Sequence, residues 1–145
     1  LTHLKLEEGK TEETKESDVR SKIAVLHSRY ASRKNTMRDK QAHPVFDADE
    51  SVAVFHNGFV TNYKELAKEL FPNKDPSKTT QSDSELIALM LGKLLKEGAD
   101  IKTAIQTLIE TKLIGTWRMV VMLTAEPNKI YVTKNAGPLY MGKSD

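Results

Sequence analysis

The order of the apolar segments constrains the fold of this chain more than any other feature of its sequence. Residues 22–27 and 51–58 are short apolar runs that predict strands, and Asn-Gly at the end of the second run predicts a tight turn. Three segments with helical apolar spacing follow one another directly. Residues 116–124 and 129–135 then predict a strand hairpin, and residues 139–142 predict the start of another strand. Strands kept apart from a run of helices predict an α+β fold with a largely antiparallel sheet.

Each predicted helix has a recognisable start or stop signal. The helices are residues 62–70, stopped by Pro72 and Pro76; residues 86–95, opened by the capping box Ser82-x-x-Glu85 and ended by Gly98; and residues 101–109, capped by Asp100. The second helix carries the widest apolar stripe, so we expect it to be the central buried helix of the domain.

The composition suits one globular domain and excludes several kinds of site. The chain has 145 residues, of which 39% are hydrophobic and 29% charged, enough to bury a core without staples. Cysteine is absent, which excludes a disulfide scaffold, a thiolate metal site and a cysteine nucleophile on these residues. Residues 1–20 are polar and low in complexity, so they predict an arm or loop, and residues 21–145 predict the domain.

Charge and motif content narrow the function further. The net charge of +2 is too weak to argue for nucleic acid by itself. The four histidines lack HxH or HExxH spacing and there is no glycine-rich phosphate loop, so we expect no metal site and no cofactor. No apolar run is long enough for a membrane span, and the first residues lack a signal-peptide pattern. Together with the absence of cysteine, this favours an intracellular, by default cytoplasmic, protein.

Two strand ends and one helix start carry side chains suited to an amino-acid ligand. Arg29 follows the first predicted strand and could hold a carboxylate through two parallel hydrogen bonds, or form a surface ion pair. Asn57 beside Gly58 offers two donors at one point, as oxyanion stabilisation requires, or is an ordinary hairpin turn. Asp83 could bind an ammonium group, or simply favour the N-terminus of its helix.

Five segments in a fixed order resemble the glutaminase domain of class II glutamine amidotransferases. They are HSRYAS, QAHPVF, HNGFVTNYKEL, QSDSELIA and the closing IGTWRMVVML…KIYVTKNAGPLYMG. The family patterns for the first four are HTRWATHG, N-[AS]-HP, HNGIIxNYxxL and SETDTE. Within the class, the segments are most similar to the glutamine–fructose-6-phosphate amidotransferases, and the resemblance covers residues 22–143.

The resemblance implies a fold, an activity and a set of roles. The family fold is the Ntn-hydrolase four-layer αββα sandwich, with two antiparallel sheets between helix layers. The family hydrolyses glutamine to glutamate and ammonia, and passes the ammonia to a second domain. By this resemblance Arg29 binds the glutamine α-carboxylate and Asp83 binds its α-amino group. Asn57 and Gly58 form the oxyanion hole.

Departures from the family pattern fall around the arginine motif. Tyr30 and Ser32, which by resemblance line the amino-acid pocket, stand where the family usually has Trp and Thr. Arg33 replaces a His and Gln41 replaces an Asn, so the loop is altered and more basic. The family nucleophile is an N-terminal cysteine whose own α-amine is the base. It belongs to a strand upstream of the arginine motif, so we expect this domain to be incomplete at its N-terminus.

The residues leave two main functions open. Retained Arg29, Asn57, Gly58 and Asp83 favour the glutamine-binding portion of an amidotransferase, with glutamine or glutamate as its ligand. The missing cysteine and the altered loop favour a non-catalytic Ntn-fold scaffold or interaction subunit of a larger assembly. On either interpretation we expect the chain alone to be inactive. A nucleic-acid module using the basic loop 29–40 is disfavoured, because no aromatic ladder accompanies those charges.

Overall fold

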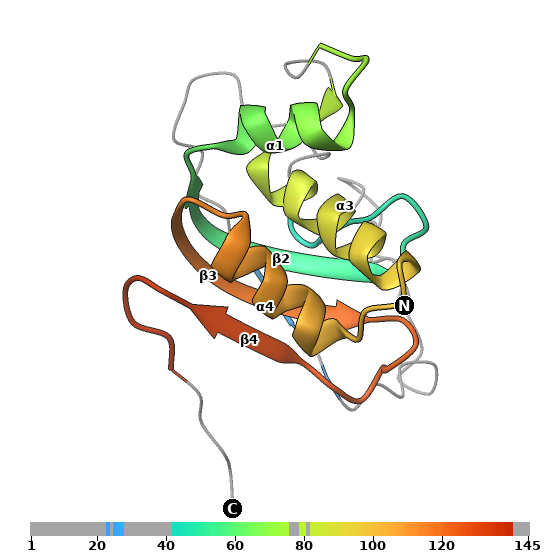
Figure 1. Cartoon of the computed structure of the whole chain (residues 1–145). Helices are drawn as coiled ribbons and strands as arrows, with labels where there is room; N and C mark the ends of the chain where they lie inside the picture. The colour runs from blue at the N-terminus through green and yellow to red at the C-terminus, as the bar shows by residue number, and fades with distance from the viewer. Residues whose placement is uncertain (1–22, 24, 28–41, 76–78, 81, 141–145) are drawn as a thin grey trace, which may run out of the picture.

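The computed structural model describes residues 23, 25–27, 42–75, 79–80 and 82–140, and Figure 1 shows the arrangement of their helices and strands. The elements follow the chain as β1 (Val45–Phe46), β2 (Val52–Val60), α1 (Tyr63–Leu70), α3 (Asp83–Lys96), α4 (Ile101–Thr111), β3 (Gly115–Leu123) and β4 (Tyr131–Lys134). The four strands form one sheet in the order β1-β2-β3-β4, with every neighbouring pair antiparallel. This arrangement confirms the α+β class.

The long central pair of strands determines which side chains face the core. β2 and β3 are nine residues each and pair along their full length, from Val52 opposite Leu123 to Val60 opposite Gly115. Successive side chains of a strand point to opposite faces. Val54 and Val60 of β2 therefore share one face, and both belong to the hydrophobic core. Asn57 and Phe59 lie on the other face.

Helices α1, α3 and α4 pack on that core face of the sheet. Figure 1 shows α3 as the central helix, with α1 and α4 beside it. Leu86, Ile87 and Leu91 of α3 and Leu108 of α4 are each 1% exposed and share one cluster with the strand residues. Burying each such side chain contributes about 1.5–3 kcal/mol. The expectation of a central buried helix over residues 86–95 is confirmed.

The capping contacts confirm the predicted starts of α3 and α4. The side chain of Ser82 accepts a hydrogen bond from the Glu85 N–H, and that of Asp100 accepts from the Lys102 and Thr103 N–H groups. Gly98 follows the C-cap of α3 at φ +95°, a conformation that glycine adopts without strain. The hairpin of β3 and β4 is confirmed as well.

Two predicted strands are wrong where the structure describes them. Residues 23 and 25–27 are not in a strand, and Leu26 is 95% exposed. An apolar run also needs a ladder partner, and the sheet order does not include these residues. Residues 139–140 are not in a strand either, and Pro138 just before them has no backbone N–H to donate. β1 was missed because two residues carry no periodicity.

Several predictions concern residues that the structure does not describe. The polar arm of residues 1–20 lies outside the described ranges and stays a prediction. The same holds for the basic loop that contains Arg33. Within the described ranges, no helix is both long and apolar enough to cross a membrane.

Candidate functional site

The exposed end of β2 carries the Asn57-Gly58 pair. Residues 57–59 are exposed, whereas β2 is buried from Val52 to His56. The predicted tight turn at Asn57-Gly58 is wrong, because β2 continues to Val60 and stays paired with β3. A Cβ at Gly58 would lie 2.0 Å from the Thr116 carbonyl oxygen of β3. Glycine therefore allows two strands to approach closely here, instead of reversing the chain.

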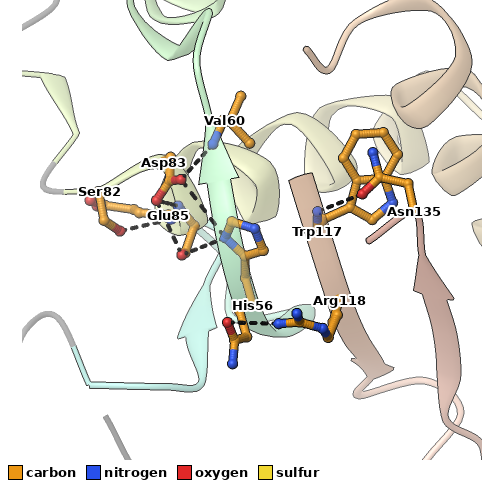
Figure 2. Close-up of polar contacts among 10 residues, drawn as sticks. His56, Val60, Ser82, Asp83, Glu85, Trp117, Arg118 and Asn135 are labelled. Carbon is orange, nitrogen blue, oxygen red and sulfur yellow. Dashed lines mark hydrogen bonds and ion pairs between the residues drawn. The ribbon is translucent and has the colours of Figure 1, made fainter. Parts of the chain in front are cut away.

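Asp83 ties the start of α3 to the end of β2. Its Oδ2 accepts a hydrogen bond from the Val60 N–H at 2.9 Å, and its Oδ1 accepts from the Ser84 N–H at 2.9 Å. Figure 2 shows the carboxylate between the strand and the first turn of the helix. The Asp83 side chain keeps 19% of its surface exposed. The carboxylate is thus held by backbone donors and is still accessible to a cationic group.

His56 lies beneath this carboxylate and joins the same contacts. The residue is 4% exposed, and its Nδ1 lies 3.0 Å from the Ser84 hydroxyl and 3.9 Å from Asp83 Oδ2. Burial lowers the pKa of His56 from its usual value, while the charge of Asp83 and the Thr116 backbone oppose that shift. At pH 7 the His56 imidazole is therefore neutral. It packs against α3 and leaves the negative charge of Asp83 available to a ligand cation.

The side chains of two asparagines form hydrogen bonds with the backbone around the start of β3. Asn62 donates through Nδ2 to the Lys112 carbonyl at 2.8 Å and accepts at Oδ1 from the Ile114 N–H at 3.0 Å. On the other side of β3, Asn135 accepts at Oδ1 from the Trp117 N–H at 2.8 Å (Figure 2). These amide bonds fix the register of β3 against β2, and with it the residue that lies opposite Asn57.

His27 lies close to His43 and to β2. The Nδ1 atoms of His27 and His43 are 3.3 Å apart, and their rings meet edge to face with centroids 4.4 Å apart. The His27 ring also lies 6.5 Å from the ring of Phe55. His27 directly precedes Ser28-Arg29, and Phe55 lies two residues before Asn57. His27 and Phe55, which are far apart in the sequence, therefore lie close together in the structure.

The structure places some of the predicted site residues and not others. Asn57 and Gly58 lie at the exposed end of β2, and Asp83 is bonded to the backbone of the same strand end. The other predicted site residues, Arg29, Tyr30 and Ser32, lie outside the described ranges. Their roles stay predictions.

The sequence interpretation missed Arg118. This arginine lies opposite Asn57 in the β2–β3 ladder, and its Nη1 donates a hydrogen bond to Asn57 Oδ1 at 3.1 Å. A signal was present, because Arg118 is the one charged residue within the apolar run of β3. Alternation along the strand places it on the face away from the core residues Trp117 and Met119.

Comparison with known proteins identifies the family to which the chain is similar. A family described as a glutamine amidotransferase domain matches residues 27–145. The chain is 32% identical over 129 residues to a glutamine–fructose-6-phosphate aminotransferase (isomerizing) from Methanococcus maripaludis, covering 86% of this chain and 21% of that protein. It is 31% identical over 142 residues to the protein of the same name from Helicobacter pylori, covering 98% of this chain and 23% of that protein.

These matches cover most of this chain but only a small part of each relative. The corresponding protein from Tropheryma whipplei is 32% identical over 120 residues, which is 81% of this chain and 19% of that protein. The chain therefore spans about a fifth of the length of these relatives.

Proposed function

Since the chain belongs to the glutamine amidotransferase family, we propose that it provides the glutamine-binding part of a class II glutaminase site. Arg29 binds the α-carboxylate of glutamine, Asp83 binds its α-ammonium group, and Asn57 with Gly58 stabilises the oxyanion. Tyr30 and Ser32 line the pocket around the amino acid.

The contact between His27 and Phe55 carries this proposal. Arg29 follows His27 by two residues, and two residues of chain span at most about 7 Å. Asn57 follows Phe55 by the same number on β2. The ring contact therefore supports an arginine and an oxyanion pair within reach of one small ligand. Asp83 joins them through its hydrogen bond to Val60 of the same strand.

The proposed roles suit the chemistry of amide hydrolysis. A guanidinium holds a carboxylate through two parallel hydrogen bonds, which orients the ligand as well as binding it. Donors aimed at the carbonyl oxygen stabilise the negative charge that develops there when the carbon is attacked. The family's nucleophile is a cysteine, and these 145 residues contain none. The proposal therefore assigns binding and oxyanion stabilisation to these residues, and not the attack itself.

The relatives suggest what receives the ammonia. Their name describes transfer from glutamine to fructose 6-phosphate. We propose that ammonia from this site goes to a sugar-phosphate acceptor bound by other domains of a larger assembly. The proposal keeps the intracellular, cytoplasmic location expected from the sequence.

The proposal includes the four-layer Ntn sandwich. The described residues supply one sheet with helices on one face only. On the opposite face Phe59 is 59% exposed and Val132 is 36% exposed. A second sheet packed on this face would bury these apolar side chains, as the family fold requires.

The alternative is a non-catalytic scaffold or interaction subunit. The absence of cysteine favours it, because the family's acyl-enzyme route needs a thiolate. The same exposed apolar face would then dock another protein of the assembly. The two candidates differ in one property, because only the first requires the site to bind glutamine.

Titration with glutamine, followed by NMR of the ¹⁵N-labelled chain, tests the proposal. Millimolar glutamine should shift the resonances of Asn57, Gly58 and Asp83 in the unmodified chain. Arg29→Lys should abolish these shifts, because lysine cannot form the bidentate bond. Arg38→Lys in the same loop is the matched control and should leave them intact. Absence of shifts at millimolar glutamine would favour the scaffold, and equal shifts in Arg29→Lys would remove Arg29 from the site.

Hydrolysis by the chain alone is the complementary measurement. An oxyanion hole without its nucleophile retains only a small part of an enzyme's rate enhancement. We expect no glutamate release from this chain above the uncatalysed background. Release that Asn57→Ala abolishes would show that a nucleophile exists among these residues.

A further inference from the structure

Arg118 and Asn57 form a cross-strand pair on the sheet face away from the helices. They lie directly opposite each other in the β2–β3 ladder. Arg118 Nη1 donates to Asn57 Oδ1 at 3.1 Å, and the dashed line from Arg118 in Figure 2 marks this bond. The contact thus joins the proposed oxyanion hole to the neighbouring strand.

The chemistry of the two groups fixes the orientation of the asparagine amide. A guanidinium has five N–H donors and no acceptor, whereas an amide has an acceptor oxygen at one end and a donor NH₂ at the other. Only the oxygen of Asn57 can therefore face Arg118. The Nδ2 atom lies on the other branch of the amide carbon and points away from the arginine. Asn57 is exposed, so this donor end is accessible to a ligand.

We propose that Arg118 is a positioning residue for the oxyanion hole, because it holds the Asn57 amide with its N–H donors toward the substrate carbonyl. This inference rests on the proposed function. Without Arg118, the amide rotates freely and presents its oxygen to the substrate part of the time, which would repel an oxyanion. Donation from a cation to the amide oxygen also polarises the amide and strengthens its N–H groups as donors.

The loop after β4 is shaped around the guanidinium. A Cβ at Gly137 would lie 1.8 Å from Arg118 Nη2 and 2.5 Å from Cζ, so a larger residue there would displace the guanidinium. Gly137 also has φ +67°, which glycine adopts without strain. Lys134 Nζ donates to the Gly137 carbonyl at 3.3 Å and ties this loop to β4. The Gly137 backbone therefore limits where the arginine side chain can lie, which keeps it pointed at Asn57.

The charges on this face favour the same role. Arg118 lies directly opposite Lys134 in the β3–β4 ladder. Like charges directly opposite each other destabilise a sheet. The strand residues that alternation places on this face contain no Asp or Glu; they are Phe46, Ala53, Phe55, Asn57, Phe59, Thr116, Arg118, Val120, Met122, Val132 and Lys134. Arg118 and Lys134 therefore place two positive charges on this face of the described strands, next to the point where an oxyanion would form.

The first experiment follows the Asn57 side-chain amide by NMR without any ligand. In the unmodified chain its side-chain ¹⁵N and carbonyl ¹³C resonances should differ from those of a free amide, because Arg118 donates to Oδ1. Arg118→Met should move them to the shifts of a free amide, and Arg118→Lys should restore part of the difference by keeping one donor. Lys68→Met removes an exposed cation from α1, on the helix side of the sheet, and it should leave them in place. Unchanged resonances in Arg118→Met, with the backbone spectrum of the sheet intact, would overturn the inference.

A second variant covers the case in which Arg118→Met does not fold. Gly137→Ala keeps the arginine but displaces its guanidinium, so it should change the Asn57 amide resonances in the same way. Resonances that stay as in the unmodified chain would contradict the role of Gly137 and of the contact.

The second experiment uses glutamine labelled with ¹³C at its side-chain carbonyl. Binding should shift this resonance in the unmodified chain and in Lys68→Met, because the hole donates to the carbonyl oxygen. Arg118→Met should still bind glutamine through Arg29 and Asp83 but lose the carbonyl shift. An equal shift in Arg118→Met would overturn the inference. No binding to the unmodified chain would count against the proposed function, and the ligand-free experiment would still decide the role of Arg118.

Discussion

The two faces of the central strands differ in composition and in exposure. On the face under the helices, Val52, Val54 and Val121 are completely buried. On the opposite face, Asn57 is exposed and bonded to Arg118. Adjacent residues of a strand point to opposite faces, so a polar group lies one residue from the core without entering it. The helix-covered face determines stability, and the opposite face carries Asn57 of the proposed site.

The largest loss of stability is expected from a substitution on the helix-covered face of the sheet. Leu91 of α3 is 1% exposed at the centre of the core. Leu91→Ala should destabilise the fold by roughly 2–5 kcal/mol, because it removes packed methyl groups and leaves a cavity. Denaturant melts measure this loss, and Lys93→Ala on the exposed side of the same helix is the control. A loss below about 0.5 kcal/mol would mean that this face of α3 is not the one that supports the core.

Gly58→Ala should destabilise the fold where β2 and β3 approach each other closely. The added methyl group would meet the Thr116 carbonyl oxygen, a backbone atom that cannot move aside alone. We expect a loss of about 1–3 kcal/mol from overpacking. Amide hydrogen exchange should show faster opening of the β2–β3 pairing. Gly98→Ala is the control, since a Cβ there has open space, so only backbone strain is added. Unchanged exchange in Gly58→Ala would show that the strands do not approach so closely.

Acid should weaken the link between α3 and β2. Burial lowers the pKa of His56 below its usual value of about 6.5. As the pH falls below that usual value, the unfolded chain binds the proton while the folded chain does not, so stability falls until the lowered pKa is reached. The contribution of one histidine is at most about 1.36 kcal/mol per pH unit. His56→Gln should remove this part of the pH dependence, and an identical slope in that variant would assign the effect to other groups.

The smallest effect is expected on the sheet face away from the helices, where the substitution should raise stability instead of lowering it. Lys134 lies directly opposite Arg118, so Lys134→Thr should stabilise the fold by about 0.2–1 kcal/mol. The gain should vanish in a background that carries Arg118→Met, because the repulsion is then already absent. Equal gains in both backgrounds would mean that the two cations do not interact.

The helix-covered face of the sheet could be predicted from the sequence, and the opposite face could not. Apolar spacing and the caps Ser82 and Asp100 located the helices, since burial and capping leave local patterns. The pair Asn57-Gly58 looked like a turn, because the close approach of Thr116 that requires glycine depends on a strand far along the chain. Arg118 was missed for the same reason. Its partner is set by strand register, which no local pattern specifies.

The most direct test of the account compares glutamine with its analogue that lacks the α-amino group, 4-carbamoylbutanoate. The account assigns the ammonium group to the Asp83 carboxylate, which Val60 and Ser84 hold in place. The unmodified chain should bind glutamine more tightly than the analogue, by roughly tenfold or more, as expected for a charge-assisted hydrogen bond. Asp83→Asn should bind the two ligands equally. A preference for glutamine that survives Asp83→Asn, or no binding of either ligand to the unmodified chain, would contradict the proposed site.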